Sequence, residues 1–319
     1  MDDGIHVDLM VFVDDACDTA LLGREPNDRR DVRQIIGVYG MGLLQADTAI
    51  DGRDGNFTAV LSPDWEIVGP NGGYLSAIVL RAVGAAAPAG HRPVSYSCQY
   101  LSRPRDRRVE ISTEAVARGR TMWCFRATLG TGDGAALQAQ IWTTDKSDGP
   151  DYEGYTSPNV ARSPITSGRD RAGQLGARFR DNFDRASSLA EQPTNPTSCS
   201  TLKRWFRFRG FDAGGDLFLD AGRSVVLVDA IVWPTFARHV ATADHIAKSV
   251  DLSVWFHESA PDAEWLLVEA VADVARAGII FGRARVWSES GVLLASGASQ
   301  MLQLARDAVR SGRLIPDQP

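Results

Sequence analysis

Residues 94–104 read VSYSCQYLSRP, and residues 250–260 read VDLSVWFHESA. These two segments lie 156 residues apart (250 − 94). A second pair, AVARGRTMWCFRATLGTGDG at 115–134 and ADVARAGIIFGRARVWSESG at 272–291, lies 157 residues apart (291 − 134). Solenoid repeats are much shorter, at about 20 to 50 residues. The agreement of the two offsets therefore predicts two copies of one domain.

The first copy combines one helix with a run of strands. In GGYLSAIVLRAVGAAA (72–87) apolar residues recur at the spacing of an amphipathic helix, and Asn71 before it is a favourable N-cap. Gly72 and Gly73 leave the first turn without side chains, which permits a close approach of another group. Strand-like patterns follow near 94–101, 109–117, 121–129 and 136–143. This order predicts an antiparallel sheet wrapped around the helix.

The second copy repeats this layout, with strand-like runs near 250–257, 265–274, 279–287 and 292–304. By the same offset, its helix covers Ser224–His239. Local propensity favours a buried strand there, because SVVLVDAIVW is rich in β-branched residues. The register of the repeat instead predicts a helix, kinked or ended by Pro234. The expected fold class is α+β, with two tandem repeats that each wrap an antiparallel sheet around a long helix.

The same observations give domain boundaries for the 319 residues. Residues 146–200 are rich in Ser, Pro, Asp, Asn and Gly and show no sustained periodicity until about Ala177. We therefore expect an N-terminal extension at 1–43, a first domain at 44–145, a linker at 146–176, a second domain at 177–305 and a C-terminal tail at 306–319.

Composition excludes several classes of protein. Hydrophobic residues make up 44% and charged residues 23%, as in a soluble globular protein. The net charge of −6 does not favour nucleic acid or an anionic membrane as a partner. No run approaches the ~20 apolar residues of a membrane-spanning helix. Asp2 and Asp3 replace the basic start of a secretory signal, so we expect a cytoplasmic protein.

Cysteine and histidine spacing gives no indication of a metal or a cofactor. Cys17, Cys98, Cys124 and Cys199 match neither a zinc site nor a disulfide framework. The nearest histidines are six residues apart, which is poor spacing for two ligands on one helical face. The chain also lacks the G-x-S-x-G elbow of α/β-hydrolases and a G-x-x-x-x-G-K-[ST] phosphate loop. We expect no metal and no cofactor.

Several motifs resemble the acyl-CoA thioesterase II family, the double-hotdog thioesterases. They are SPDWEIVGPNGGYLSAIVLRA at 62–82, RPVSYSCQYLSRP at 92–104, SVDLSVWFHE at 249–258, EWLL at 264–267 and GVLLASGASQ at 291–300. The resemblance covers about residues 44–305 and implies two tandem hotdog repeats. It also implies thioester hydrolysis of a fatty or related acyl-CoA without a cofactor.

The family's catalytic set is an Asp on the second hotdog helix, a Ser or Thr at the start of the next strand and a Gln on the last strand. The matching residues here are Asp229, Ser249 and Gln300. A carboxylate within an apolar run needs hydrogen-bond donors or a raised pKa. Either state suits a group that orients or deprotonates water. The resemblance thus implies one water molecule held by these three side chains.

The entry to the first helix is the candidate substrate-binding element. Backbone N–H groups at a helix N-terminus suit an oxyanion, and the family uses its hotdog helices in this way. The candidate residues are Asn71, Gly72, Gly73 and Tyr74. By the 156-residue offset, Gly73 corresponds to Asp229, which suggests that the second copy is the catalytic half and the first copy is more structural.

Two other functions remain open at this stage. Hotdog folds also host dehydratases and enzymes that act on carrier-protein thioesters, and a fold does not fix a function. A protein that binds acyl-CoA without turning it over is the third alternative. In each case we expect no nucleic-acid or membrane partner. A homo-oligomer is expected, because the sheet edges of fused hotdogs commonly pair.

Overall fold

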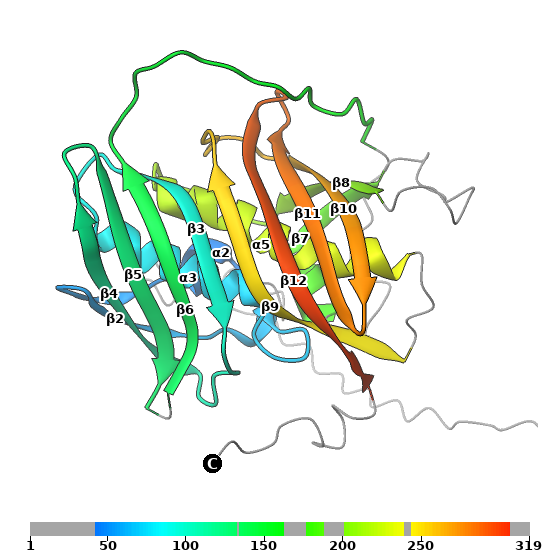
Figure 1. The fold of residues 1–319 in the computed structure, drawn as a ribbon, viewed down its shortest axis with the longest axis horizontal. Helices are drawn as coiled ribbons and strands as arrows, with labels where there is room; N and C mark the ends of the chain where they lie inside the picture. Colours follow the sequence, from blue (N-terminus) through cyan, green and yellow to red (C-terminus); the bar gives the residue numbers. More distant parts are fainter. Residues whose placement is uncertain (1–41, 133, 163–176, 188–200, 239–243, 307–319) are drawn as a thin grey trace, which may run out of the picture. The chain divides into compact units, whose positions relative to one another are not determined.

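The two repeats share one continuous antiparallel sheet in the computed structural model of this chain (Figure 1). The structure describes residues 42–132, 134–162, 177–187, 201–238 and 244–306, all of which belong to the compact unit Gly40–Pro319. The sheet has 12 strands in the order β1-β2-β4-β5-β6-β3-β9-β12-β11-β10-β8-β7. The strands that follow the two long helices, β3 and β9, therefore meet at its centre.

Strands of the first repeat form one half of the sheet. They are β1 (Asp51–Arg53), β2 (Asn56–Val60), β3 (Arg92–Tyr100), β4 (Arg108–Arg118), β5 (Met122–Thr131) and β6 (Gly134–Thr144). The other half contains β7 (Phe183–Ser187), β8 (Thr201–Phe208), β9 (His245–Phe256), β10 (Leu266–Arg276), β11 (Ile279–Ser288) and β12 (Leu293–Ala305). The four strand-like runs predicted for each copy all appear as strands, with ends shifted by a few residues.

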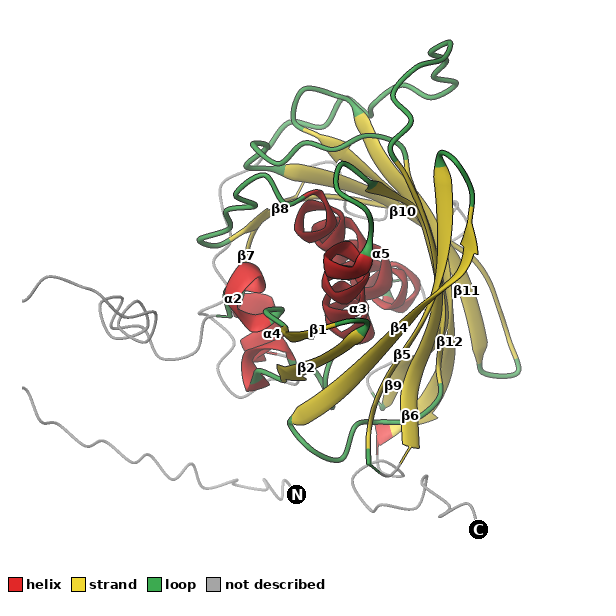
Figure 2. Ribbon diagram, turned by 90° about the vertical axis from the view of Figure 1, so that its left-hand side faces the viewer, coloured by secondary structure: helices red, strands yellow, loops and turns green. Residues whose placement is uncertain are grey.

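Two long helices, α3 (Gly72–Ala86) and α5 (Leu217–Ala237), pack against each other on the concave side of the sheet (Figure 2). Among the described residues, three short helical segments accompany them: α2 (Leu44–Asp47), η1 (Pro63–Trp65) and α4 (Ala177–Asp181). The predicted α+β architecture, with one long helix per repeat, is confirmed. In the described part of the chain, no helix combines the length and the apolar character that crossing a membrane requires.

The second long helix differs from its prediction at the N-terminal end. It begins at Leu217 instead of Ser224, because Asp216 caps it and accepts hydrogen bonds from the backbone N–H groups of Phe218 and Leu219, both at 2.9 Å. Pro234 lies inside α5 and does not end it. The choice of helix over strand for this β-branched segment is therefore right.

An approximate twofold relation links the repeats. The offset in residue number between counterparts is not the same in the strands as in the helices. At the centre of the sheet Ser97 pairs with Ser253, which confirms the offset of 156 (253 − 97) for strands. Between the helices, a Cβ on Gly73 would lie 2.6 Å from the Cα of Val226, and one on Gly222 would lie 3.3 Å from the Cβ of Ala77.

These reciprocal contacts identify the helical counterparts. In a twofold arrangement a contact between i and j recurs between their counterparts, and an offset of 149 (222 − 73) relates these two contacts, so that Gly73 corresponds to Gly222 and Ala77 to Val226. The same offset matches the half-buried Arg81 and Gly84 with the half-buried Ala230 and Trp233. The predicted equivalence of Gly73 and Asp229 is wrong. The second repeat therefore carries seven more residues (156 − 149) between the matched positions of its helix and those of its central strand. The counterpart of Asp229 is Leu80 (229 − 149).

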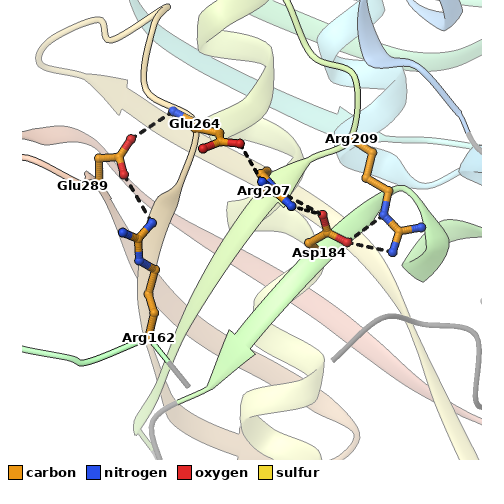
Figure 3. Close-up of polar contacts among 6 residues, drawn as sticks. All are labelled: Arg162, Asp184, Arg207, Arg209, Glu264 and Glu289. Atoms are coloured by element: carbon orange, nitrogen blue, oxygen red, sulfur yellow. Dashed lines mark hydrogen bonds and ion pairs between the residues drawn. The ribbon is translucent and has the colours of Figure 1, made fainter. Parts of the chain in front are cut away.

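A cluster of charged side chains links the segment after β6 to the second repeat through hydrogen bonds and ion pairs (Figure 3). It runs from Arg162 to Glu289, which also accepts a hydrogen bond from the Glu264 backbone N–H, and from the Glu264 side chain through Arg207 and Asp184 to Arg209. Burial alone would raise the pKa of Asp184, but hydrogen bonds from Arg207 and Arg209 outweigh it and lower that pKa. Residues 146–162 of the predicted linker form neither helix nor strand, and 163–176 lie outside the described residues.

Candidate active site

A buried carboxylate lies where the N-terminus of α3 meets the middle of α5. Asp229 is 2% exposed. Its Oδ2 accepts hydrogen bonds from the Asn71 side-chain amide at 2.8 Å and from the Gly73 backbone N–H at 2.9 Å. Its Oδ1 accepts one from the Ser249 hydroxyl at 2.6 Å. Residues of both repeats therefore surround one carboxylate.

The first turn of α3 is built to receive this carboxylate. The Asn71 side-chain oxygen caps the helix by accepting a hydrogen bond from the Tyr74 backbone N–H at 3.0 Å, which leaves its amide nitrogen to donate to Asp229. A Cβ on Gly73 would lie 3.0 Å from the Cβ of Asp229, so a side chain there would separate the helices. The free N–H groups and the dipole of this helix end favour a negative charge.

A β-bulge brings Ser249 to the same point. Leu252 and Val254 are buried, so simple alternation along β9 would turn Ser249 away from the helices. The pairing of β9 with β12 skips Val250, and the extra residue reverses the alternation below it. The Ser249 hydroxyl consequently faces α5 and Asp229.

Two opposing effects set the pKa of Asp229. Burial raises the pKa, and the hydrogen bonds from Ser249, Gly73 and Asn71 lower it. Burial dominates, so the pKa of Asp229 lies above its usual value. Once ionised, such a carboxylate is a stronger base than an exposed aspartate, and its three donors fix its orientation.

Gln300 does not join this cluster. A Cβ on Gly297 would lie 2.9 Å from a methyl group of Val228, so this residue and Ser299 face α5. Gln300 lies on the opposite, exposed face of β12, where its backbone N–H donates to Asp251 at 2.9 Å. The expected contact between Gln300 and Asp229 is not found. Neighbouring residues of a strand point to opposite faces, and Gln300 is one residue away from Ser299, which faces the helix.

Tyr74 belongs to the core and not to a substrate-binding surface. Its side chain is fully buried, and its hydroxyl donates to the Asp47 carbonyl at 2.7 Å and accepts from the Ser62 backbone N–H at 3.1 Å. Its ring stacks on Trp65 at a centroid distance of 5.4 Å. The Gly73 N–H donates to Asp229, so it is not the free oxyanion donor that the sequence suggested.

Further polar side chains lie beside the carboxylate. The hydroxyls of Ser76 and Tyr100 are 2.9 Å apart, and the Ser76 hydroxyl is 3.8 Å from the Cys98 sulfur. A Cβ on Gly72 would lie 2.8 Å from the Tyr100 ring. Burial raises the pKa of Cys98 to about 11, so its thiol stays neutral at pH 7 and is a poor nucleophile. The sequence could have revealed the polar side chains that β3 contributes to this group, because alternation along the strand places them on one face.

The second repeat's helix start forms a different structure. A small cleft there is lined by residues that include Pro93, Asp220, Ala221 and Phe256. Pro93 is the counterpart of Ser249 (249 − 156), and Leu80 is the counterpart of Asp229. Apolar residues thus occupy the positions of the Ser249 hydroxyl and the Asp229 carboxylate at this end of the twofold arrangement. No cluster of three His, Cys, Asp or Glu side chains suited to a metal occurs among the described residues.

Comparisons with known proteins agree with this architecture. The family model of the acyl-CoA thioesterase N-terminal domain matches residues 61–144, and that of the C-terminal domain matches residues 159–302. Together the two models cover most of the chain. A comparison with curated proteins finds no match.

Solved structures share the fold at low sequence identity. The acyl-CoA thioesterase II TesB2 of Mycobacterium marinum is 15% identical, with a TM-score of 0.67 over 82% of this chain and 97% of that one. The tesB protein of Mycobacterium avium subs paratuberculosis is 19% identical, with a TM-score of 0.67 over 82% and 98%. A hot dog fold protein of unknown function from Alicyclobacillus acidocaldarius is 18% identical, with a TM-score of 0.69 over 82% and 98%.

The domain matches and the shared fold lead to one assignment. Both halves of the family are present, in the order N-terminal then C-terminal, and the large antiparallel sheet around two helices is that of the hotdog structures. The chain belongs to the acyl-CoA thioesterase family of thioester hydrolases and has the double-hotdog fold.

Proposed function

We propose that this chain hydrolyses an acyl-CoA with a water molecule that Asp229 orients and deprotonates. The observation that carries the proposal is the environment of Asp229, a buried carboxylate held by three donors from two repeats. A carboxylate offers about four acceptor positions. Three are filled by these donors, and the fourth, on the oxygen that binds Ser249, suits a water molecule.

The reaction follows from this geometry. The water donates one proton to Asp229 while its oxygen attacks the thioester carbonyl carbon, which gives a tetrahedral intermediate. The intermediate collapses with cleavage of the carbon–sulfur bond, and the proton on Asp229 passes to the leaving CoA sulfur. The products are a carboxylic acid and CoA, and no covalent enzyme intermediate is needed. Gln300 takes no part in this scheme because it lies on the exposed face.

Release of CoA from a panel of acyl-CoAs, followed with a thiol reagent, tests this function. We expect turnover of at least one chain length above the uncatalysed rate. Binding of acyl-CoA without turnover would favour the non-catalytic alternative. Turnover of the same acyl group only when it is attached to a carrier protein would favour the alternative of an enzyme that acts on carrier-protein thioesters.

Replacement of Ser249 by alanine is expected to lower kcat about 10- to 100-fold, since a hydrogen bond to a charged group contributes about 1.5–3 kcal/mol. The base must be ionised, so kcat/KM falls as the pH drops below the pKa of Asp229. The Ser249 hydroxyl lowers that pKa, and its loss moves the acidic limb of the profile to higher pH. A pH series of kcat and of kcat/KM measures both effects.

Two further variants complete this experiment. Ser249→Thr keeps the hydroxyl and is expected to retain most of the activity with the original acidic limb. Ser253 lies on the same strand, and its hydroxyl contacts Ser97, 3.1 Å away across the centre of the sheet. Ser253→Ala is expected to leave the profile unchanged. An acidic limb that stays in place in Ser249→Ala would contradict the proposed role.

A basic loop beside the site supports CoA as the carrier of the acyl group. Arg103, Arg105, Arg107 and Arg108 are exposed between β3 and the start of β4. The Arg103 side chain lies against Gly69, near the start of α3, where a Cβ would be 2.7 Å from its Nε. The corresponding segment of the second repeat, 259–264 (103 + 156 to 108 + 156), reads SAPDAE and has no basic residue. Arginine pairs well with the phosphates of CoA.

Replacement of Arg103, Arg105 and Arg107 by glutamine is expected to raise KM for acyl-CoA about tenfold, which corresponds to about 1.4 kcal/mol of binding free energy. Because the arginines contact only the nucleotide end, kcat changes little and KM for the matching pantetheine thioester does not change. Exposed Arg126 is the matched control, and Arg126→Gln should leave both KM values unchanged. An equal loss on both substrates would contradict a phosphate contact.

A further inference from the structure

Four hydrogen-bonding side chains line the inner face of β3 and the adjoining turn of α3. They are Ser76, Tyr96, Cys98 and Tyr100. Tyr96 and Cys98 are 1% and 2% exposed, and Ser76 is fully buried. Within the part of the chain that the structure describes, no group meets the distance and angle of a regular hydrogen bond with the buried Tyr96 hydroxyl, and its polar neighbours are the Cys98 thiol and the Ser76 hydroxyl. A thiol is a weak hydrogen-bonding group, so a buried hydroxyl with only these neighbours gains from a better partner on a ligand.

This polar lining adjoins the catalytic carboxylate. The Tyr100 ring lies against Gly72, which stands between the two residues that donate to Asp229. Burial, and to a smaller extent the charge of Asp229, raises the pKa of Tyr96 and Tyr100. Both phenols are therefore neutral at pH 7 and near enough to Asp229 to sense its charge. The lining and the carboxylate form one environment.

The twofold relation supplies an internal comparison. The counterparts of Tyr96, Cys98 and Tyr100 are Leu252, Val254 and Phe256, by the strand offset of 156. The counterpart of Ser76 is Val225, by the helix offset of 149. All four counterparts are apolar and buried, so packing alone does not require polar groups at these positions. At these four positions, polar residues occur only at the end that also holds Asp229 and Ser249.

We propose that the region beside Asp229 selects an acyl group that carries a neutral oxygen substituent, a hydroxyl or a keto group, bound by Tyr96 and Tyr100. This inference rests on the proposed function and names its substrate class. A plain alkyl chain would suit a lining made of the four apolar counterparts. An ionised substituent is disfavoured because the four lining side chains include no cation and Asp229 is negative when active.

Paired substrates test this proposal. The values of kcat/KM are measured for saturated acyl-CoAs and for CoA thioesters of the same length with a hydroxyl or keto group at carbon 3 or 4. We expect the oxygenated member of at least one pair to be preferred by about tenfold or more, because a site built to hydrogen-bond a hydroxyl discriminates against an analogue that lacks it. In the variant Tyr96→Phe/Tyr100→Phe this ratio is expected to fall towards one.

Each result bears on the proposal separately from the function. Preference of the wild type for the saturated member of every pair overturns the proposal, as does a preference that survives in the double variant. Absence of CoA release from every substrate overturns the proposed function instead. Phe256→Tyr, which places the hydroxyl at the counterpart position, should leave the ratio unchanged. Because the wild-type comparison needs no substitution, the proposal remains testable even if the double variant does not fold.

Discussion

Asp229→Asn is expected to lower kcat about a thousandfold, within the range of about 10²–10⁴ that a general base contributes. The amide has nearly the shape of the carboxylate and can accept hydrogen bonds from Gly73 and Asn71, but it cannot take a proton from water. Initial rates of CoA release at saturating acyl-CoA measure the effect. A rate equal to that of the wild type would remove Asp229 from the mechanism.

The same substitution has an expected effect on stability with the opposite sign. The native pKa of Asp229 is raised, so the native state holds this proton at pH values where the unfolded chain has lost it. Stability therefore falls as the pH rises from the unfolded to the native pKa, and the full cost remains above the native pKa. Asparagine carries no charge and avoids this cost. At pH 7 we expect the free energy of unfolding of Asp229→Asn to equal or exceed that of the wild type.

Asp251→Asn is the matched control for both measurements. Asp251 lies on β9 near Ser249, pairs with Gln300 across the sheet, and accepts a hydrogen bond from the Gln300 backbone N–H. Its substitution should change kcat by no more than a few-fold. Denaturant unfolding of all three proteins at pH 7 separates loss of chemistry from loss of fold. An unfolded Asp229→Asn variant would contradict the view that this charge is retained for function at a cost in stability.

The sequence predicted the strands better than the helical register. The offset of 156 rests on the segments at 94–104 and 250–260, which become the paired central strands, so it holds where it was measured. It fails in the helices because seven more residues separate the matched positions of α5 and β9 than separate those of α3 and β3. These residues are divided among a longer C-terminal end of α5, a longer connection and an earlier start of β9. Differences in length are common outside the paired strands. None of the compared motifs included the stretch between the helix and the central strand, so the comparison could not detect this difference.

The candidate site was predicted in part. Asp229 and Ser249 approach each other as the resemblance implied, although they lie 20 residues apart in the chain. Gln300 was misplaced because period-two alternation leaves no tolerance for a one-residue error. The side-chain contact of Asn71 with Asp229 spans 158 residues. The sequence identified Asn71 as a cap and as a candidate substrate-binding residue but not as a partner of Asp229, because local propensity carries no information about such a distant contact.

The residues at the start of α3 differ in role from their twofold counterparts in α5. Asn71 and Tyr74 correspond to Asp220 and Arg223 (offset 149). Asp220 and Arg223 form a buried ion pair, with side chains that are 6% and 2% exposed. The Arg223 guanidinium also donates to the carbonyls of Ala260 and Ala263 at 2.7 and 2.6 Å. The start of α3 thus binds the catalytic carboxylate, whereas the corresponding part of α5 holds the loop that contains Ala260 and Ala263.

Arg223→Met is expected to lower the free energy of unfolding by about 3–5 kcal/mol, since removal of one partner leaves a buried charge uncompensated. Methionine occupies a similar length but makes none of the hydrogen bonds, so the carboxylate of Asp220 keeps only the Ala260 backbone N–H, 2.9 Å from its Oδ2, among these contacts. Two loop carbonyls lose their donor as well. Urea denaturation followed by tryptophan fluorescence measures the loss.

The double variant Asp220→Asn/Arg223→Met distinguishes a buried charge from lost packing. If the cost arises from the uncompensated carboxylate, removing that charge should recover most of the stability, because neutral replacements for both members of a buried pair are often tolerated. If the cost arises from the missing guanidinium contacts, the double variant should be as unstable as Arg223→Met. The exposed pair Arg126–Glu114 sets the scale, and Arg126→Met should cost less than about 1 kcal/mol. An equally small cost for Arg223→Met would mean that the loop does not depend on this ion pair.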